Sequence, residues 1–141
     1  MRKALIGSAL ILGASSALTV LEPVSAAEPC AFSTQRISGR NITVNNCPPI
    51  SGVFQNGRWQ VRFGLAAGEF LYIGTDRRTG SAIELYSREM RGNTRRPVYV
   101  FRNRNTTYTV TYQTNDQDTI RLEVFQGGRR QLNQLLTRVS N

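Results

Sequence analysis

The chain contains no histidine, and Lys3 is its only lysine. Without these residues it lacks Ser–His and Cys–His nucleophilic pairs, histidine zinc sites and, once an N-terminal signal is removed, lysine Schiff bases. Acidic residues are also scarce, since nine Asp and Glu oppose eighteen Lys and Arg. The sequence therefore predicts no catalytic residue, no metal site and no cofactor, and we expect that the protein is not an enzyme.

Paired carboxylates for glycoside hydrolysis are the one common catalytic design that these absences leave open. Only Glu69, Asp76, Glu84 and Glu89 lie close enough in sequence to be considered. The alternation of apolar residues puts Glu84 on the outward face of its strand, while Asp76 and Glu89 fall near opposite ends of one predicted hairpin. We expect no catalytic pair among them.

Long apolar runs are absent except at the N-terminus. Two basic residues open the chain, an apolar stretch follows from Ala4 to Leu21, and small residues end it at VSAAE. This pattern predicts a signal peptide over residues 1–27, with cleavage after Ala26 or Ala27. A retained membrane anchor is the alternative, because the stretch approaches the length of a spanning helix. We favour removal, and hence a secreted or periplasmic bacterial protein with no transmembrane segment.

Cysteine is limited to Cys30 and Cys47. In an exported chain such a pair predicts a disulfide. A two-residue turn at Ser38-Gly39 would place Cys30 directly opposite Cys47 at a non-hydrogen-bonded position, where side chains approach most closely. We therefore expect an N-terminal hairpin stapled at its base. A redox-active or metal-binding pair is the alternative, but the spacing is not CxxC and no histidine accompanies it.

Beyond Cys47 apolar and polar residues alternate with the period of strands. The alternating segments are RWQVRF, FLYIG, SAIELYS, PVYVFRN, TTYTVTY and DTIRLEVFQ. The last segment, RRQLNQLLTRV, fits a strand or a short helix, and we favour a strand. Short connections favour an antiparallel meander, so we predict a single all-β domain over residues 28–141 that forms a small barrel or a sandwich. The predicted core includes Trp59, Val61, Phe63, Tyr99, Phe101, Tyr108, Val110, Ile120, Leu122 and Val124.

Two nonapeptides resemble each other within the chain. VFQNGRWQV begins at Val53 and VFQGGRRQL begins at Val124, and they match at Val, Phe, Gln, Gly, Arg and Gln. Both put Gly where a tight turn requires positive φ. The pattern predicts two hairpins with the same turn chemistry.

Several segments also resemble a known group of proteins. The segments are NGRWQV, TDRRTGSAIEL, RRPVYVFRN and IRLEVFQGGRRQLNQLL. Together they resemble small secreted all-β proteins of cyanobacteria over most of the chain that follows the signal. The resemblance implies an exported β protein, and it implies no activity.

Arginines gather in the predicted turns. In a meander alternate turns fall at the same end, and one end then carries Arg58, Arg77, Arg78, Arg102, Arg104, Arg129 and Arg130, opposed only by Asp76. We predict that these arginines bind an anionic polysaccharide or another polyanion through bidentate contacts and counterion release. The alternative is that they are solvated charges. The protein would then be a protein-interaction or envelope-structural module that uses a sheet face.

The aromatic residues indicate no specific nucleic-acid motif. A two-residue turn at Arg104-Asn105 would put Phe101 opposite Tyr108 and Tyr99 opposite Val110, on the face away from Arg102. A stacking platform for single strands requires aromatic and basic side chains on one face. We therefore expect these aromatics, and Tyr112 with them, in the core. The oligomeric state stays open.

Overall fold

The computed structural model of the protein describes residues 13–21 and 26–140, and most of the predicted signal peptide lies outside the described residues. The described part consists of strands joined by turns. The strands are β1 (Phe32–Ile37), β2 (Arg40–Asn45), β3 (Gly52–Gln55), β4 (Trp59–Ala66), β5 (Glu69–Asp76), β6 (Ala82–Ser87), β7 (Glu89–Asn93), β8 (Arg96–Asn103), β9 (Thr106–Gln113), β10 (Asp116–Gln126) and β11 (Arg129–Ser140). Within those residue ranges, no helix is long and apolar enough to cross a membrane.

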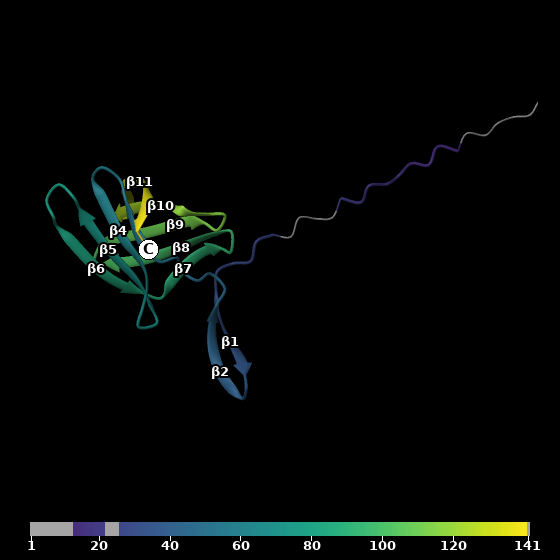
Figure 1. Cartoon of the computed structure of the whole chain (residues 1–141), viewed down its shortest axis with the longest axis horizontal. Coiled ribbons are helices and arrows are strands. Elements are labelled where there is room, and N and C mark those ends of the chain that lie inside the picture. The colour runs from purple at the N-terminus through teal and green to yellow at the C-terminus, as the bar shows by residue number, and fades with distance from the viewer. Residues whose placement is uncertain (1–12, 22–25, 141) are drawn as a thin grey trace, which may run out of the picture.

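Strands β3 to β11 form one antiparallel sheet in the order β6-β5-β4-β3-β11-β10-β9-β8-β7. The first and last of these strands in the chain pair with each other, with Gln55 opposite Thr137. Only Arg88 separates the edge strands β6 and β7, so residues 82–93 form one bent strand whose halves pair with β5 and with β8. The sheet therefore curls into a nearly closed barrel (Figure 1). The predicted all-β meander is confirmed, as a barrel.

The register between β8 and β9 follows from their two-residue turn. Phe101 lies opposite Tyr108 and Tyr99 opposite Val110, as predicted. Arg104 in the turn adopts a φ of 55°, the left-handed conformation that such tight turns require. The inward face of both strands is consequently aromatic or aliphatic.

The C-terminal segment is a strand, β11, as favoured from the sequence. Leu136 is fully buried and Leu132 is partly buried, whereas Leu135 and Val139 remain about half exposed. A helix would have gathered all four on one face. Alternation within the strand instead sends Leu132 and Leu136 into the barrel and leaves the other two outside.

The barrel interior is filled with aromatic side chains from facing strands. The Phe63 and Tyr99 rings lie 4.9 Å apart between centroids, and those of Tyr72 and Phe101 lie 5.3 Å apart. Most of the predicted core is buried, and the remaining members, Trp59, Tyr108 and Val124, are partly buried. The core also takes in residues that the sequence prediction left out, namely Ile50, Phe54, Phe70, Tyr72 and Leu136.

The N-terminal hairpin of β1 and β2 projects from the barrel (Figure 1). Its turn residues Ser38 and Gly39 have φ values of 50° and 78°, and its register is the predicted one, with Ile37 opposite Arg40. The predicted disulfide is confirmed, since Cys30 and Cys47 are bonded with their Cα atoms 5.5 Å apart. The hairpin is therefore closed at its base, next to the barrel.

The predicted likeness of the two nonapeptide hairpins is wrong for the first of them. Gly127 and Gly128 between β10 and β11 both have positive φ, but Gly57 does not. The β3–β4 connection is instead organised by Asn56, whose Oδ1 accepts hydrogen bonds from the backbone N–H groups of Arg58 at 2.9 Å and Trp59 at 2.8 Å. This side-chain turn needs no left-handed residue.

Candidate binding site at the open end of the barrel

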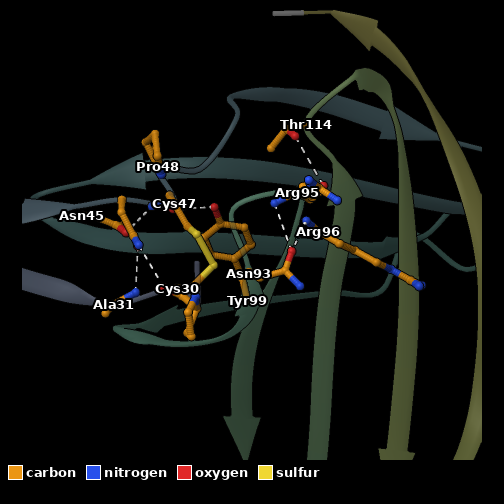
Figure 2. The surroundings of a disulfide bond; sticks show 12 residues. Cys30, Ala31, Asn45, Cys47, Pro48, Asn93, Arg95, Arg96, Tyr99 and Thr114 are labelled. Carbon is orange, nitrogen blue, oxygen red and sulfur yellow. Dashed lines mark hydrogen bonds between the residues drawn. A yellow bond between two sulfur atoms is a disulfide. The ribbon is translucent and has the colours of Figure 1, made fainter. Parts of the chain in front are cut away.

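One end of the barrel, here called the plugged end, is crossed by residues 47–50, which follow the N-terminal hairpin. Cys47 and Ile50 are buried there. The Tyr99 hydroxyl donates a hydrogen bond to the Cys47 carbonyl and the Tyr112 hydroxyl donates one to the Pro48 carbonyl, each at 2.7 Å. Figure 2 shows the disulfide beside Tyr99. Residues 47–50 are thus joined to the barrel interior by two hydrogen bonds.

The opposite end, here called the open end, carries the turns β3–β4, β5–β6, β8–β9 and β10–β11. It contains a cavity of about 670 Å³. The cavity is lined by Trp59, Gln60, Tyr72, Gly74, Thr75, Asp76, Thr79, Ser81, Ala82, Ile83, Tyr108, Leu122, Val124, Gln131 and Leu132. The exposed turn residues Thr79 and Ser81 belong to its mouth. The wall therefore combines apolar and aromatic side chains with polar ones such as Gln60, Thr75 and Gln131, and its mouth faces solvent.

Two tyrosines and one glycine shape this wall. The rings of Tyr72 and Tyr108 lie 5.3 Å apart between centroids. A Cβ atom on Gly74 would overlap the hydroxyl end of Tyr72. Gly74 therefore lets the Tyr72 side chain lie along the strand rather than across the cavity, which is a recognised use of glycine inside a strand.

The hydroxyls of Tyr72 and Tyr108 have no hydrogen-bond partner among the described residues. Tyr72 is only 2 % exposed as a residue. Burial, reinforced by the nearby Tyr108, raises the pKa of Tyr72 far above its ordinary value, so the hydroxyl stays neutral. The cavity thus offers two hydroxyl groups that can donate and accept hydrogen bonds.

Asp76 is the one charged side chain among the described residues that line the cavity. Arg58 lies 3.1 Å from its carboxylate, and this hydrogen bond lowers the pKa of Asp76. The Arg58 guanidinium also lies 4.6 Å from the centre of the Trp59 ring, within range of a cation–π contact. The charge of Asp76 is therefore already compensated at the rim.

The seven predicted anion-binding arginines divide into two groups. Arg58 pairs with Asp76 at 3.1 Å, Arg102 with Glu89 at 2.7 Å and Arg130 with Glu123 at 3.1 Å. The expectation that only Asp76 opposes the group is therefore wrong. Glu89 lies opposite Val100 in the register of β7 and β8, next to Arg102 on the outer face of the barrel, which the order of turns alone could not reveal.

The other four, Arg77, Arg78, Arg104 and Arg129, are exposed, and their guanidinium groups form no ion pair with a carboxylate in the described part of the chain. Among the described residues, the Arg77 guanidinium donates only to the Asn56 carbonyl, at 2.6 Å. We call these four the free arginine set. They lie in or next to three of the four turns at the open end, and that they bind an anion stays a prediction.

Neighbouring turns at the open end are joined by backbone hydrogen bonds. The Arg77 N–H donates to the Arg58 carbonyl at 2.7 Å, which links the β5–β6 and β3–β4 turns. The Gly127 N–H donates to the Asn105 carbonyl at 3.1 Å, which links the β10–β11 and β8–β9 turns. The guanidinium groups are therefore carried by tethered turns.

Sequence reasoning missed the cavity, although one signal for it exists. Glycine inside the strand segment FLYIG, two residues after a tyrosine, indicates a close approach at that face. Trp59 and Tyr108, which were predicted as core, pack partly buried against it and also border the cavity. In the residues that the structure describes, no group of three or more His, Cys, Asp and Glu gathers as a metal site.

No protein-family model, no curated protein and no solved structure matches this chain.

Proposed function

We propose that this protein is an exported, non-catalytic binding module that contacts an anionic polymer through the free arginine set. The observation that carries the proposal is the presence of four guanidinium groups at one end of the barrel, with no carboxylate partner among the described residues. A planar guanidinium binds sulfate, phosphate or carboxylate through paired N–H donors. Several such groups on tethered turns suit repeating anionic units.

The three ion-paired arginines contribute less to this proposal. Arg58, Arg102 and Arg130 would have to exchange a carboxylate for the polymer, and the gain from such an exchange on an exposed surface is small. We therefore restrict the proposed anion-binding site from the seven predicted arginines to the four of the free arginine set. A sulfated or uronic polysaccharide suits it better than a single-stranded nucleic acid, because the polysaccharide requires no aromatic stacking platform.

Export is part of the proposal. It is supported by the predicted signal peptide and by the Cys30–Cys47 disulfide, a bond that persists in oxidising compartments. A bacterial periplasm or the cell exterior provides both that redox environment and contact with anionic polysaccharides.

The test is a titration of the mature, oxidised protein with dextran sulfate across a salt series. One variant replaces Arg77, Arg78, Arg104 and Arg129 with Ala. A matched control makes the same change at the exposed arginines elsewhere on the surface, namely Arg36, Arg40, Arg62 and Arg88. We expect affinity to fall steeply with salt, and to fall about tenfold or more in the first variant but little in the control.

The control separates a located site from the effect of net charge, because both variants lose the same number of guanidinium groups. Equal losses in the two variants, or an affinity that does not change with salt, would contradict the proposal. Either result would favour an interaction through a sheet face, with the arginines serving only solubility.

A further inference from the structure

The cavity at the open end has a composition that the arginines do not explain. Its wall combines the rings of Trp59, Tyr72 and Tyr108 with aliphatic side chains such as Ile83 and Leu132. Small-molecule sites are usually concave and apolar, with a few polar groups that fix the orientation of the ligand, and volumes of roughly 300–1,000 Å³. The cavity of about 670 Å³ lies within this range.

The Tyr72 hydroxyl is the strongest indication of a ligand. Tyr72 is 2 % exposed, it lines the cavity, and its hydroxyl has no partner among the described residues. Within the described residues no buried side-chain oxygen or nitrogen lacks a hydrogen-bond partner, so this hydroxyl is accessible from the space of the cavity and is not enclosed by protein. A ligand that brings an oxygen atom to this point replaces water at the Tyr72 hydroxyl, and the Tyr108 side chain, whose ring centroid lies 5.3 Å from that of Tyr72, provides a second hydroxyl at the cavity.

The charges around the cavity select against an ionic ligand. No arginine is among the described lining residues, so an anion inside would lose hydration without meeting a guanidinium. A cation would find Asp76, which Arg58 already neutralises. The interior therefore suits an uncharged molecule, even though the surrounding surface is basic.

We propose that this cavity binds a small, uncharged ring compound whose carbonyl or hydroxyl oxygen forms hydrogen bonds with Tyr72 and Tyr108. The ring packs against Trp59 and the aliphatic wall, and the oxygen lies at the tyrosine pair. Gly74 keeps the Tyr72 side chain along the barrel wall and so maintains the space. This site is separate from the proposed polymer site and does not depend on it.

The proposal is tested with Nile red, an uncharged fluorescent ring dye that carries a carbonyl oxygen. The mature, oxidised protein is titrated with the dye, and both the dye emission and the emission of Trp59, the only tryptophan, are followed. We expect saturable binding of one dye per protein, quenching of Trp59, and an affinity that does not change with salt. Salt independence distinguishes this site from the polymer site.

Two substitutions examine the cavity itself. Tyr72→Phe removes one hydroxyl and keeps the ring, and we expect it to weaken dye binding about fivefold, the size of one net hydrogen bond. Leu132→Trp fills the cavity from a partly buried position, and we expect it to weaken binding at least about tenfold. Circular dichroism checks that both variants are folded. If Leu132→Trp fails to fold, the dye affinity of Tyr72→Phe still tests the proposal.

The matched control is Tyr112→Phe, the same chemical change at the plugged end, where the hydroxyl is already hydrogen-bonded to Pro48. It should leave dye affinity unchanged, as should replacement of the free arginine set by Ala. Absence of saturable binding, equal effects of Tyr72→Phe and Tyr112→Phe, or unchanged binding by a folded Leu132→Trp variant would overturn the proposal. The Leu132→Trp variant should still bind dextran sulfate. A failure of the cavity proposal can therefore be distinguished from a failure of the polymer proposal.

Discussion

Each end of the barrel contains a pair of tyrosines, and among the described residues only the hydroxyls of the pair at the plugged end form hydrogen bonds with the protein. At the plugged end the Tyr99 and Tyr112 rings are stacked, with centroids 6.1 Å apart, and each hydroxyl donates to a backbone carbonyl of residues 47–50. At the open end the Tyr72 and Tyr108 hydroxyls meet no acceptor in the described part of the chain. The same residue type therefore stabilises the fold at one end and is available to a ligand at the other.

The difference arises from what covers each end. Residues 47–50 connect the disulfide-closed hairpin to β3, and this connection crosses the barrel and brings carbonyl groups to the tyrosines. At the open end the connections are tight turns, such as Gly127-Gly128, which return directly to the next strand. Covering an end requires extra chain, and in the described residues only the plugged end has it.

The largest expected effect compares two leucines on the inward face of β11. Leu136 is fully buried in the packed interior, whereas Leu132 is partly buried at the cavity. Leu136→Ala should lower the free energy of unfolding by about 3 to 4 kcal/mol, because it creates a void among close-packed side chains. Leu132→Ala should cost at most about half as much, because its side chain already borders open space. Urea unfolding measures both, and equal losses would contradict the contrast between the ends.

The second prediction concerns the disulfide that closes the hairpin at the plugged end. Cys30→Ala together with Cys47→Ala should lower the free energy of unfolding by about 3 kcal/mol, because the unfolded chain regains the entropy of an open loop. The measurement is urea unfolding beside the oxidised parent. Nile red affinity should stay unchanged in the folded variant, and a parallel loss of dye binding would show that the two ends are not independent.

Local rules explain which parts of the fold could be predicted from the sequence. Two-residue turns at Ser38-Gly39 and Arg104-Asn105 determine which residues lie opposite each other, and the two-residue period then decides which side chains point inward. The disulfide follows from the same count. These inferences need only a few consecutive residues, and the structure confirms them.

The features that could not be predicted depend on distant strands. The pairing of β3 with β11 and the bend at Arg88 belong to the closure of the whole sheet, which also determines the register of Glu89 beside Arg102. The cavity is likewise a consequence of closure, because inward residues at one end find no covering segment. The prediction of a positive φ at Gly57 was wrong for a local reason, because hydrogen bonds to the Asn56 side chain form the turn that glycine was expected to form.

The third prediction removes single hydroxyls from the two tyrosine pairs. Tyr99→Phe should lower the free energy of unfolding by about 1 to 2 kcal/mol, because it leaves the Cys47 carbonyl without its donor inside the plug. Tyr72→Phe should cause no loss, because its hydroxyl has no partner among the described residues. Thermal and urea unfolding of the two variants measure the difference. A stability loss on Tyr72→Phe that equals the loss on Tyr99→Phe would show that the open-end hydroxyl serves the fold.

The smallest expected effect is a loss of stability at acid pH, where the carboxylates that pair with Arg58 and Arg102 become protonated. Hydrogen bonds from Arg58 and Arg102 lower the pKa values of Asp76 and Glu89 respectively. A carboxyl group with a lowered pKa in the folded protein contributes stability above its unfolded value, about 4, and this contribution is lost as the pH falls through the folded value. The urea midpoint should therefore be similar at about pH 7 and pH 5 and fall by about pH 3.

The double variant Asp76→Asn and Glu89→Gln tests the origin of this acid dependence. It keeps the side-chain shapes and removes the titrating groups, so its midpoint should be slightly lower than that of the parent at neutral pH and should change less on acidification. The effect is small because both pairs are partly exposed and screened by water and salt. If parent and variant lose stability in parallel, the acid-sensitive groups lie elsewhere, and the Arg58–Asp76 pair then contributes charge compensation at the cavity rim rather than stability.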